Sequence, residues 1–460
     1  MTQSTPRPLF AERALLPGGW AEDVRIDVDA TGRIVAVVAG ASADGAERAR
    51  GPVVPATPDL HSHAFQRAMA GLAEVAGTGD DSFWTWRETM YRTVGLVSPE
   101  DVEAIAAKLY VELLKGGYGA VAEFHYLHHD RDGNAYADPA ELSKRILAAA
   151  GRTGIGLTLL PVFYAHGNFG GAAASPGQRR FLNGVDDFLA LLAGLGPACA
   201  AAGAGLGMAF HSLRAATPDE MREILAAVPG LGLDVAPVHI HAAEQTREVD
   251  DCLAWSGRRP VEWLLDEMPV DGRWCLIHAT HMTADETRRA AASGAVAGLC
   301  PQTEANLGDG LFPATDFASS GGRFGIGTDS HVATGVAEEL RLLEYGQRLR
   351  DRRRNRLAAP GASVGRTIFD AALAGGAQAL AQPLGRIEPG ATASLVVLDG
   401  DDPFVAVARG DAILDRWLFA LGDRAVRDVM VAGEWRIRDG RHADEAAIDE
   451  SFREVLARLA

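Results

Sequence analysis

The sequence has few cysteines, no recognisable secretion signal and no surplus of positive charge. Its N-terminus, MTQSTPRPLFAER, has neither the basic start nor the apolar stretch of a signal peptide. No segment is predicted to cross a membrane, and we expect a cytoplasmic protein. The 4 cysteines are widely spaced, form no C-x-x-C pair and have mostly apolar neighbours. They are predicted to be buried free thiols: Cys199, Cys252, Cys275 and Cys300.

Acidic residues outnumber basic ones. The chain has 44 Lys and Arg against 61 Asp and Glu, which gives a formal net charge of −17. Nucleic acid and anionic membrane surfaces would be repelled by this charge, so neither is predicted as a partner. A small anion can still bind if one or two arginines line its pocket, because local bidentate contacts outweigh a distant, salt-screened net charge.

The composition is that of a folded globular protein. Hydrophobic residues make up 47% of the chain and charged residues 23%, which is too apolar for a disordered protein. A length of 460 residues exceeds that of a usual single domain. We therefore expect one large domain and a smaller one.

Short apolar runs alternate with helical stretches through the middle of the chain, as in successive βα units. Helices are predicted over 99–115, 218–227 and 284–292, each preceded by a Ser or Thr cap. The pattern fits an α/β protein with a (β/α)8 TIM-like barrel, although a doubly wound sheet would give similar local patterns. Eight strands are predicted, at 52–60, 120–125, 155–163, 206–210, 237–241, 274–278, 295–300 and 323–327.

The two ends of the chain read as β-hairpins. Residues 6–55 and 386–460 contain short alternating segments with turn signals, and neither end has enough strands to bury a core alone. We therefore predict one small β-sandwich domain built from 1–55 and 386–460, beside a barrel over 56–385. A helix over 445–459 is expected to cover the sandwich.

Histidines occupy the predicted C-terminal ends of several strands, which is the functional face of a barrel. Alternation on an extended strand points His61 and His63 the same way, so both imidazoles can reach one metal. His241 follows strand 5 and Asp329 follows strand 8. Three imidazoles and a carboxylate suit Zn²⁺, with Fe²⁺ or Mn²⁺ as alternatives. His239 lies two residues deeper and is expected to be structural.

The same motifs resemble those of the amidohydrolase superfamily. PDLHSH from Pro58, HAAE from His241, His278 and TDS from Thr328 match its pattern, and GRIEPG followed by ASLVVL resembles its sandwich signature. Within the superfamily, LHSHAFQRAMAGLAE over 60–74 resembles formimidoylglutamate deiminases. FWTWRETMYR, FHSLRA and CPQTEANLGDG agree with that resemblance.

The resemblance implies hydrolysis of N-formimino-L-glutamate to N-formyl-L-glutamate and ammonia in histidine degradation. It also implies a homodimer. Other members of the superfamily hold two metals bridged by a modified lysine, usually on strand 4, but no lysine stands at 210–214. One Zn²⁺ per chain is therefore expected. Two alternatives remain: another mononuclear deaminase acting on a nucleobase or guanidino compound, and a non-catalytic scaffold with this fold.

Roles follow for the groups around the metal. His278 would orient the nucleophilic water or accept its proton, and Asp329 could share that proton. Glu244 would carry protons to the departing nitrogen. His331 is expected either behind the metal ligands or at the surface. His125, His128 and His129 are interpreted mainly as part of a lid loop.

The expected substrate is a small dianion, so its recognition needs cationic forks. Arg87 and Arg214 are the candidates for binding the two carboxylates, and the sequence leaves open which arginine binds which. Glu304 and Asn306 are expected to shape the pocket. Three further residues are predicted to bind substrate: Gln66, Tyr126 and His211.

Overall fold

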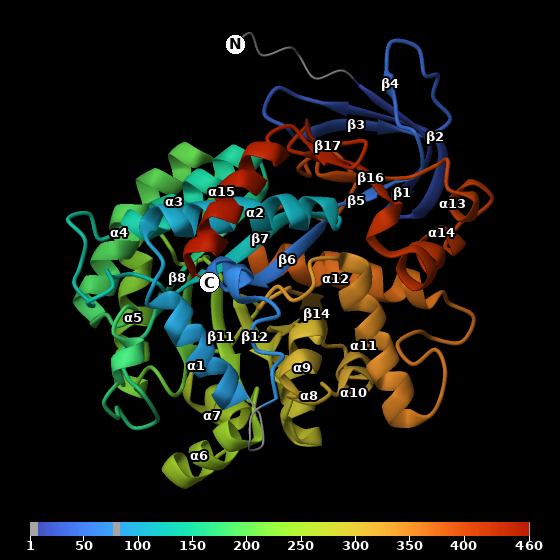
Figure 1. The fold of residues 1–460 in the computed structure, drawn as a ribbon. Coiled ribbons are helices and arrows are strands. Elements are labelled where there is room, and N and C mark those ends of the chain that lie inside the picture. Colours follow the sequence, from blue (N-terminus) through green and yellow to red (C-terminus); the bar gives the residue numbers. More distant parts are fainter. Residues whose placement is uncertain (1–7, 77–82, 460) are drawn as a thin grey trace.

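A closed ring of parallel strands forms the centre of the molecule. The computed structural model describes residues 8–76 and 83–459 (Figure 1). The sheet order is β14-β13-β12-β11-β10-β8-β7-β6, with every pair parallel. The strands are β6 (Thr57–Ser62), β7 (Tyr118–His125), β8 (Gly156–Phe163), β9 (Gly205–Leu206), β10 (Met208–Ser212), β11 (Val238–Ala242), β12 (Trp274–His278), β13 (Val296–Leu299) and β14 (Arg323–Ile326).

Backbone contacts between the first and last strands close this sheet. Ser62 forms a parallel bridge with Asp329, and the Asp329 amide donates to the His61 carbonyl at 2.9 Å. The predicted (β/α)8 barrel is therefore confirmed, and the doubly wound alternative, which would leave two sheet edges open, is wrong.

Helices surround the barrel, and their starts follow from capping residues. Ser98, Thr217 and Thr283 cap the helices that begin at Pro99, Pro218 and Ala284, as predicted. Each accepts the amide of the third helical residue and forms a capping box. The barrel helices are α1 (Phe83–Val94), α2 (Pro99–Lys115), α3 (Glu141–Thr153), α4 (Val185–Ala202), α5 (Pro218–Ala227), α6 (Thr246–Ser256), α7 (Pro260–Glu267), α8 (Ala284–Ser293), α9 (Pro301–Leu307), α10 (Ala314–Ser319), α11 (Val336–Asp351) and α12 (Val364–Leu380).

Two predicted strands are each divided in the structure. The apolar run 52–60 contains β5 (Val53–Pro55), which belongs to a second sheet, and β6 of the barrel. The run at 206–210 is divided at Gly207, where an added Cβ would lie 2.6 Å from Leu160 and 2.7 Å from Pro237. Both divisions lie within apolar runs, so periodicity gave no signal for them.

The second sheet draws its strands from both ends of the chain, as predicted. Its order is β18-β17-β16-β15-β5-β1-β2-β3, with β4 paired to β1, and it buries a small core of its own that includes Val24, Ile26, Leu395 and Met430. Its strands are β1 (Leu9–Leu16), β2 (Gly19–Val28), β3 (Ile34–Val38), β4 (Glu47–Arg48), β5, β15 (Leu395–Leu398), β16 (Val426–Val431), β17 (Glu434–Arg438) and β18 (Arg441–His442).

The C-terminal helix packs on the barrel rather than over the sandwich, which corrects the prediction. Helix α15 (Glu445–Leu459) has the predicted bounds but lies along α2 (Figure 1). Its Asp449 pairs with Lys108 at 2.8 Å, and its Arg458 pairs with Asp101. The short helices α13 (Pro403–Ala406) and α14 (Ala412–Arg416) precede β16 in the chain.

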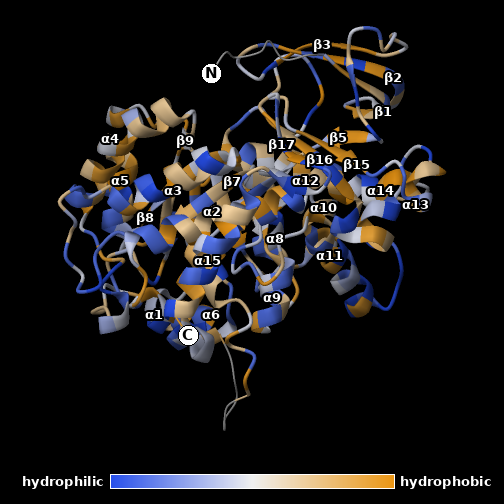
Figure 2. Cartoon of the chain, turned by 45° about the horizontal axis from the view of Figure 1, so that its top comes forward, coloured by the Kyte–Doolittle hydropathy of each residue, from blue (hydrophilic) through white to orange (hydrophobic). Residues whose placement is uncertain are grey.

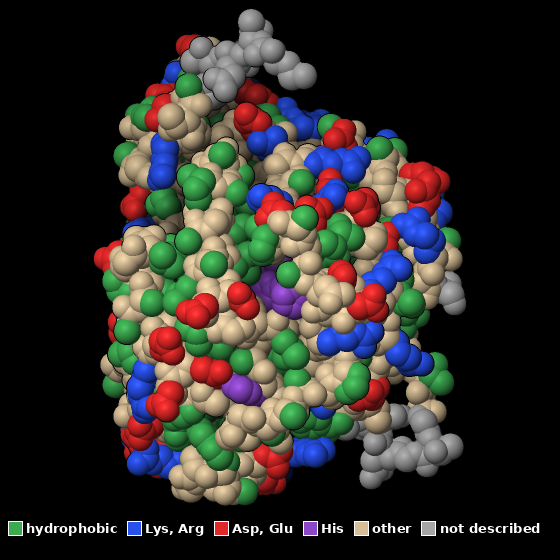
Figure 3. All heavy atoms as spheres, turned by 90° about the vertical axis from the view of Figure 1, so that its left-hand side faces the viewer, with side chains coloured by type: hydrophobic (Ala, Val, Ile, Leu, Met, Phe, Trp, Pro, Cys, Tyr) green, Lys and Arg blue, Asp and Glu red, His purple; other side chains and the backbone are tan. Residues whose placement is uncertain are grey.

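Helix α4 meets the length and composition of a membrane span, which the sequence analysis did not identify. Its mean hydropathy is 1.4 and 28% of it is buried. Figure 2 shows its hydrophobic colour at the edge of the barrel. Phe188, Leu192 and Leu195 are buried against the rest of the protein, and a helix of a globular core passes the same test. Figure 3 shows the side of the molecule on which α4 lies in Figure 1, and acidic and basic side chains are interspersed there with hydrophobic ones.

Candidate active site

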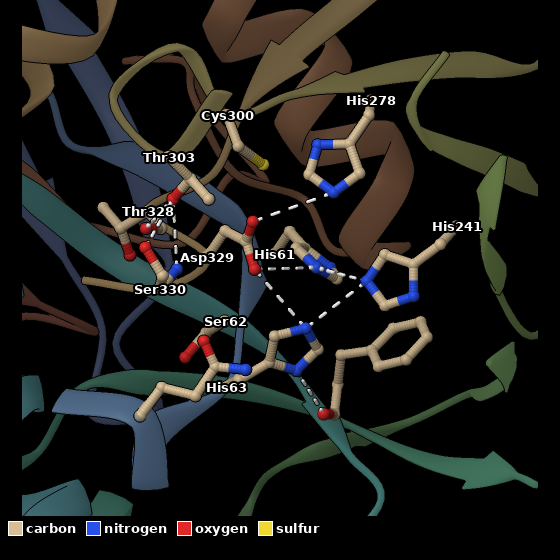
Figure 4. A network of polar contacts seen from close by, with 12 residues as sticks. His61, Ser62, His63, His241, His278, Cys300, Thr303, Thr328, Asp329 and Ser330 are labelled. Atoms are coloured by element: carbon tan, nitrogen blue, oxygen red, sulfur yellow. Dashed lines mark hydrogen bonds and ion pairs between the residues drawn. The ribbon is translucent and has the colours of Figure 1, made fainter. Parts of the chain in front are cut away.

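Four side chains from the C-terminal ends of three strands meet above the barrel. The Nε2 atom of His241 lies 3.1 Å from that of His61 and 3.3 Å from that of His63. Asp329 Oδ1 lies 3.5 Å from His61 Nε2 and 3.4 Å from His63 Nε2 (Figure 4). Ligands 2.0–2.2 Å from a tetrahedral Zn²⁺ are about 3.3 Å apart. These four separations are those expected between neighbouring ligands of one tetrahedral metal ion.

The imidazole tautomers direct lone pairs into this cluster. The Nδ1–H group of His63 donates to the Phe124 carbonyl at 2.9 Å, and that of His241 donates to the His211 carbonyl at 2.8 Å. Burial lowers the pKa of both side chains, so both are neutral. Two unprotonated Nε2 atoms then face each other at 3.3 Å, an arrangement that favours a cation between them.

A buried network fixes the backbone that carries these residues. Asp59 accepts the His61 and Thr328 amides through Oδ1 and the Thr328 hydroxyl through Oδ2. His331 donates from Nδ1 to the Thr328 hydroxyl and accepts the His63 amide at Nε2. Because His331 is fully buried, the surface alternative for it is wrong. Its contacts place it behind the cluster.

Glu123 supports the same segment from β7. It accepts the Ser62 hydroxyl at 2.6 Å, the Ala64 amide at 2.7 Å and the Tyr110 hydroxyl at 3.1 Å. Sequence reasoning missed both Glu123 and Asp59. One signal in the sequence could have identified them: each is an acidic residue inside an apolar strand. A buried carboxylate is tolerated only when hydrogen-bond donors surround it.

His278 lies beside the cluster among carboxylates. Its Nδ1 is 3.4 Å from Glu304, and its Nε2 is 3.7 Å from both Glu244 Oε1 and Asp329 Oδ2. Burial alone would lower the pKa of His278, but the nearby charge of Glu244 and the hydrogen bond to Glu304 raise it above its usual range. Burial raises the pKa of Glu244. A protonated imidazole beside a carboxyl group of raised pKa can exchange protons near neutral pH.

The backbone around these side chains is unusual. Non-glycine residues with positive φ are uncommon, and strained conformations concentrate at functional sites. Several occur at the strand ends described above, with φ between 47° and 65°. They are Ala243, His278, Ala279, Asp329 and His331.

A small cavity of about 50 Å³ opens beside Asp329. It is lined by His63, His241 and Asp329 and by aromatic side chains that include Trp86 and Tyr164. All five predicted substrate-binding residues also line it: Gln66, Arg87, Tyr126, His211 and Arg214. A larger hollow between α12 and the β1–β2 turn contains none of these side chains.

Two guanidinium groups face this cavity with unused donors. Arg214 is buried and lies 3.8 Å from Glu248, and its Nε has no hydrogen-bond partner among the described residues. Arg87 stacks over the Trp84 and Tyr91 rings, at 4.6 Å and 5.5 Å from their centroids, and its Nε is also buried without such a partner. Donors of this kind are suited to carboxylates.

Neutral polar side chains line the rest of the cavity beside Asp329. The Gln66 amide donates to the Tyr126 hydroxyl at 3.0 Å, which leaves Gln66 Oε1 without a hydrogen-bond partner among residues 8–76 and 83–459. The His211 ring lies against Tyr164, with centroids 4.4 Å apart. Sequence reasoning missed Tyr164, which directly follows β8, because its distance from the histidine motifs along the chain gives no hint of contact.

Some predicted residues lie elsewhere. Asn306 is exposed and donates to Glu74, so the expectation that it shapes this pocket is wrong. His128 and His129 bond to the carbonyls of Val162 and Leu182 and tie their loop to neighbouring segments. His239 donates from Nε2 to the Ala379 carbonyl at 2.9 Å inside the barrel, as expected of a structural residue. All four cysteines are buried and free, as predicted.

Comparisons with known proteins agree with this arrangement. Residues 53–436 match the model of the amidohydrolase family, and residues 7–51 match that of the N-terminal domain of the formimidoylglutamate deiminase HutF. A formimidoylglutamate deiminase from Pseudomonas aeruginosa is 63% identical over 98% of this chain and 99% of its own length. A 5-methylthioadenosine/S-adenosylhomocysteine deaminase from Natronomonas pharaonis is 29% identical over 95% of this chain and 94% of its own.

Solved structures show the same fold. A crystal structure of an amidohydrolase from Brucella melitensis superposes with a TM-score of 0.93, at 51% identity, and covers 98% of this chain and 99% of that one. The family model spans most of the chain, and the Pseudomonas relative matches it almost end to end. The chain therefore belongs to the amidohydrolase family and, within it, to the formimidoylglutamate deiminases, which makes it a hydrolytic deiminase.

Proposed function

We propose that this chain is a zinc-dependent enzyme that hydrolyses N-formimino-L-glutamate to N-formyl-L-glutamate and ammonia. The observation that carries the proposal is the pair of arginines, Arg87 and Arg214, in the cavity beside the cluster of three imidazoles and one carboxylate. A substrate with two carboxylates and an amidine-like group matches two cationic forks next to a hydrolytic centre.

Zinc is the metal that best suits the donor set. His61, His63, His241 and Asp329 would hold it, and three neutral imidazoles with one carboxylate are borderline ligands of the kind Zn²⁺ prefers. When bound there, the metal supplies a water molecule of lowered pKa at neutral pH. The cavity is lined by His63, His241 and Asp329, so a bound substrate would lie beside the residues that would hold the metal.

The protein's own residues then move the protons. Water adds to the formimino carbon, the C–N bond to the terminal nitrogen breaks, and a carbonyl replaces it. Glu244 would pass both protons of the water to that nitrogen, the first as water adds across the C=N bond and the second as the C–N bond breaks, because burial raises its pKa and lets it hold a proton near neutral pH. His278, held by Glu304 at Nδ1, would orient the attacking water through Nε2.

Substrate orientation would come from the cavity wall. Arg87 and Arg214 bind the carboxylates, Gln66 Oε1 can accept from the formimino N–H groups, and Tyr126 and His211 lie where they can donate to a carboxylate. A nucleobase carries no carboxylate for these guanidinium groups, so the buried Nε donors of Arg87 and Arg214 would stay without a hydrogen-bond partner, which is costly. The cavity therefore favours the dianion over the nucleobase and guanidino alternatives.

An ammonia-release screen tests the proposal. Purified enzyme is assayed with N-formimino-L-glutamate, a guanidino acid and several nucleobases, and its metal content is measured in parallel. We expect ammonia from the first substrate, about one zinc per chain, and loss of activity on chelation that zinc restores. Release from a nucleobase but none from N-formimino-L-glutamate would overturn the substrate assignment.

Cytoplasmic localisation, a homodimer, and the exclusion of nucleic acid and membrane partners stay predictions. The charge of −17 supports the two exclusions. Size-exclusion chromatography with light scattering tests the dimer directly.

A further inference from the structure

The carboxylate of Asp329 lies between two groups of possible ligands. Its Oδ1 faces His61 and His63, whereas its Oδ2 faces His278 Nε2 at 3.7 Å on the other side (Figure 4). The same His278 atom lies 3.7 Å from Glu244 Oε1. Asp329 Oδ2, His278 Nε2 and Glu244 Oε1 therefore form a second group of possible ligand atoms next to the first.

Asp309, in the loop after α9, completes this second set. Its side chain is 5% exposed, its Oδ1 accepts the Gln245 amide, and its Oδ2 is buried without a hydrogen-bond partner in the described part of the chain. One ligand atom from each of Glu244, His278 and Asp309 lies within 4.8 Å of the others. A buried carboxylate oxygen without a partner is costly unless the site binds something.

We propose that Glu244, His278 and Asp309, together with Asp329 Oδ2, form a second and weaker site for a divalent cation such as Zn²⁺. The separations of 3.7 Å are close to the roughly 3.3 Å expected between two ligands of one tetrahedral Zn²⁺. Glu304 contacts His278 Nδ1, as carboxylates contact metal-bound imidazoles, and leaves Nε2 for the cation.

The ligand chemistry explains why this site is weaker than the first. It has one imidazole where the first has three, and its remaining ligands are carboxylate oxygens. A cation there must also displace any proton shared between His278 and Glu244. The first equivalent of metal therefore fills the histidine-rich cluster, and the second binds only at higher free zinc.

Occupation of the second site has a predictable effect. A cation there would engage Glu244 and His278 and would stand at the edge of the substrate cavity. We therefore expect excess zinc to inhibit the enzyme reversibly, although the first equivalent is required for activity.

Metal stoichiometry tests the site without reference to substrate. Wild-type protein containing one zinc per chain is dialysed against zinc buffers from the nanomolar to the high micromolar range, and bound zinc is measured. We expect a second equivalent to bind. Asp309→Asn keeps the side-chain shape but cannot give up a proton to become an anionic ligand, so it should bind the first equivalent normally and weaken the second by about tenfold or more.

Two further variants make the test sharp. Asp316→Asn changes an exposed acidic residue on the nearby α10 and should bind zinc as the wild type does. Glu244→Gln removes a different ligand and should also lose the second equivalent, which keeps the test valid if Asp309→Asn fails to fold. A wild type that stays at one zinc per chain, or a second equivalent unchanged in Asp309→Asn and Glu244→Gln, overturns the proposal.

An activity measurement links the site to inhibition. Ammonia release is followed over the same zinc buffers, and inhibition should appear where the second equivalent binds and disappear when free zinc is lowered again. Asp309→Asn should shift the inhibitory zinc concentration upward by about tenfold or more. Inhibition at the same zinc concentration in both proteins would contradict it. If the proposed substrate is wrong, the stoichiometry still decides the metal site.

Discussion

At the scale of single residues, substrate binding in the cavity is expected to depend on charged side chains that are almost fully buried. Arg214 is 7% exposed and Glu244 is 5% exposed. In such surroundings a charge-assisted hydrogen bond is stronger than at the surface, and the loss of one partner costs more. Substitutions here should therefore lower activity, and those that leave a buried charge without its partner should also lower stability.

Arg214→Ala should lower kcat/KM for N-formimino-L-glutamate by about 10²- to 10³-fold, because the substitution leaves a substrate carboxylate unpaired in a buried site. The loss should shrink to a few-fold for the formimino analogue that lacks the carboxylate bound by Arg214. N-formimino-4-aminobutyrate and N-formiminoglycine each lack one of the two carboxylates and are the analogues to compare.

The matched control is Arg222→Ala on α5, where an exposed arginine pairs with Asp219 and Glu267. It should leave kcat/KM within about twofold. Equal losses in Arg214→Ala for the full substrate and both analogues would count against a carboxylate-binding role.

Glu244→Gln should reduce kcat by about 10²- to 10⁴-fold with little change in KM, because it keeps the hydrogen-bonding shape but cannot transfer a proton. Metal content should stay near one per chain at low free zinc, since Glu244 is outside the first cluster. Steady-state kinetics with metal analysis measures both. A variant with kcat within threefold of the wild type would remove Glu244 from the proton path.

At this scale the sequence predicted the residues whose spacing carries chemical meaning. The alternation of His61 and His63, and the positions of His241 and Asp329 after strands, predicted four residues that the structure brings close together. Asp309 was missed because its role depends on where a loop folds back. Asn306 was misplaced because residues 301–307 form helix α9, which carries this side chain to the surface, where it donates to Glu74.

At the scale of elements, the seam between β6 and β14 sets the geometry of the metal cluster. Gly327 follows β14, and a Cβ there would lie 2.7 Å from His61 Cβ and 2.8 Å from its amide nitrogen. No side chain fits without displacing His61. The glycine therefore lets the first and last strands approach closely enough to bring His61 beside Asp329.

Gly327→Ala should lower the zinc affinity of the first site by about tenfold or more and destabilise the protein by about 1–3 kcal/mol, because overpacking shifts the backbone of a ligand. Competition with a chelator and thermal unfolding measure the two effects. Gly196→Ala in α4 is the control, since a Cβ there meets nothing within 4 Å. Unchanged zinc affinity in Gly327→Ala would show that the seam adjusts without moving His61.

Capping residues and apolar runs predicted most helices and strands well, because both signals depend only on residues that are close together in the sequence. Helices α2, α5 and α15 have the expected bounds, and so does β12. The run at 52–60 was wrong as a single strand, since β5 and β6 are both buried and no polar turn separates them. The amphipathic pattern of α15 predicted a helix but could not say which surface its apolar face covers.

At the scale of the whole molecule, buried neutral histidines couple the fold to pH. His239 is fully buried, and burial lowers its pKa to about 4. The unfolded chain takes up a proton on this group near pH 6.5, whereas the folded protein does so only near pH 4. Its contribution to stability is therefore present above pH 6.5 and is lost as the pH falls toward 4.

His239→Gln keeps an amide donor for the Ala379 carbonyl but does not titrate. Between pH 7 and pH 4 the wild type should lose about 3 kcal/mol more unfolding free energy than the variant. Urea unfolding at several pH values measures this, with chelator present so that metal binding does not contribute. Parallel pH profiles for the two proteins would show that His239 titrates alike in both states.

The barrel and the composite sheet were both predicted. Local sequence patterns could not show, however, that the barrel sheet closes on itself. Whether β6 pairs with β14 depends on the sum of strand tilts around the whole ring, which no local pattern encodes. The structure supplies that closure through the Ser62–Asp329 bridge.

The same bridge has a consequence for biosynthesis. His61 and His63 leave the ribosome early, whereas Asp329 emerges only after most of the barrel has been made. A nascent chain can offer a passing metal ion at most two or three imidazoles, without the carboxylate that completes the cluster. Tight metal binding should therefore follow closure of the barrel. The ion would then stabilise a barrel that has already folded and would not direct its folding during synthesis.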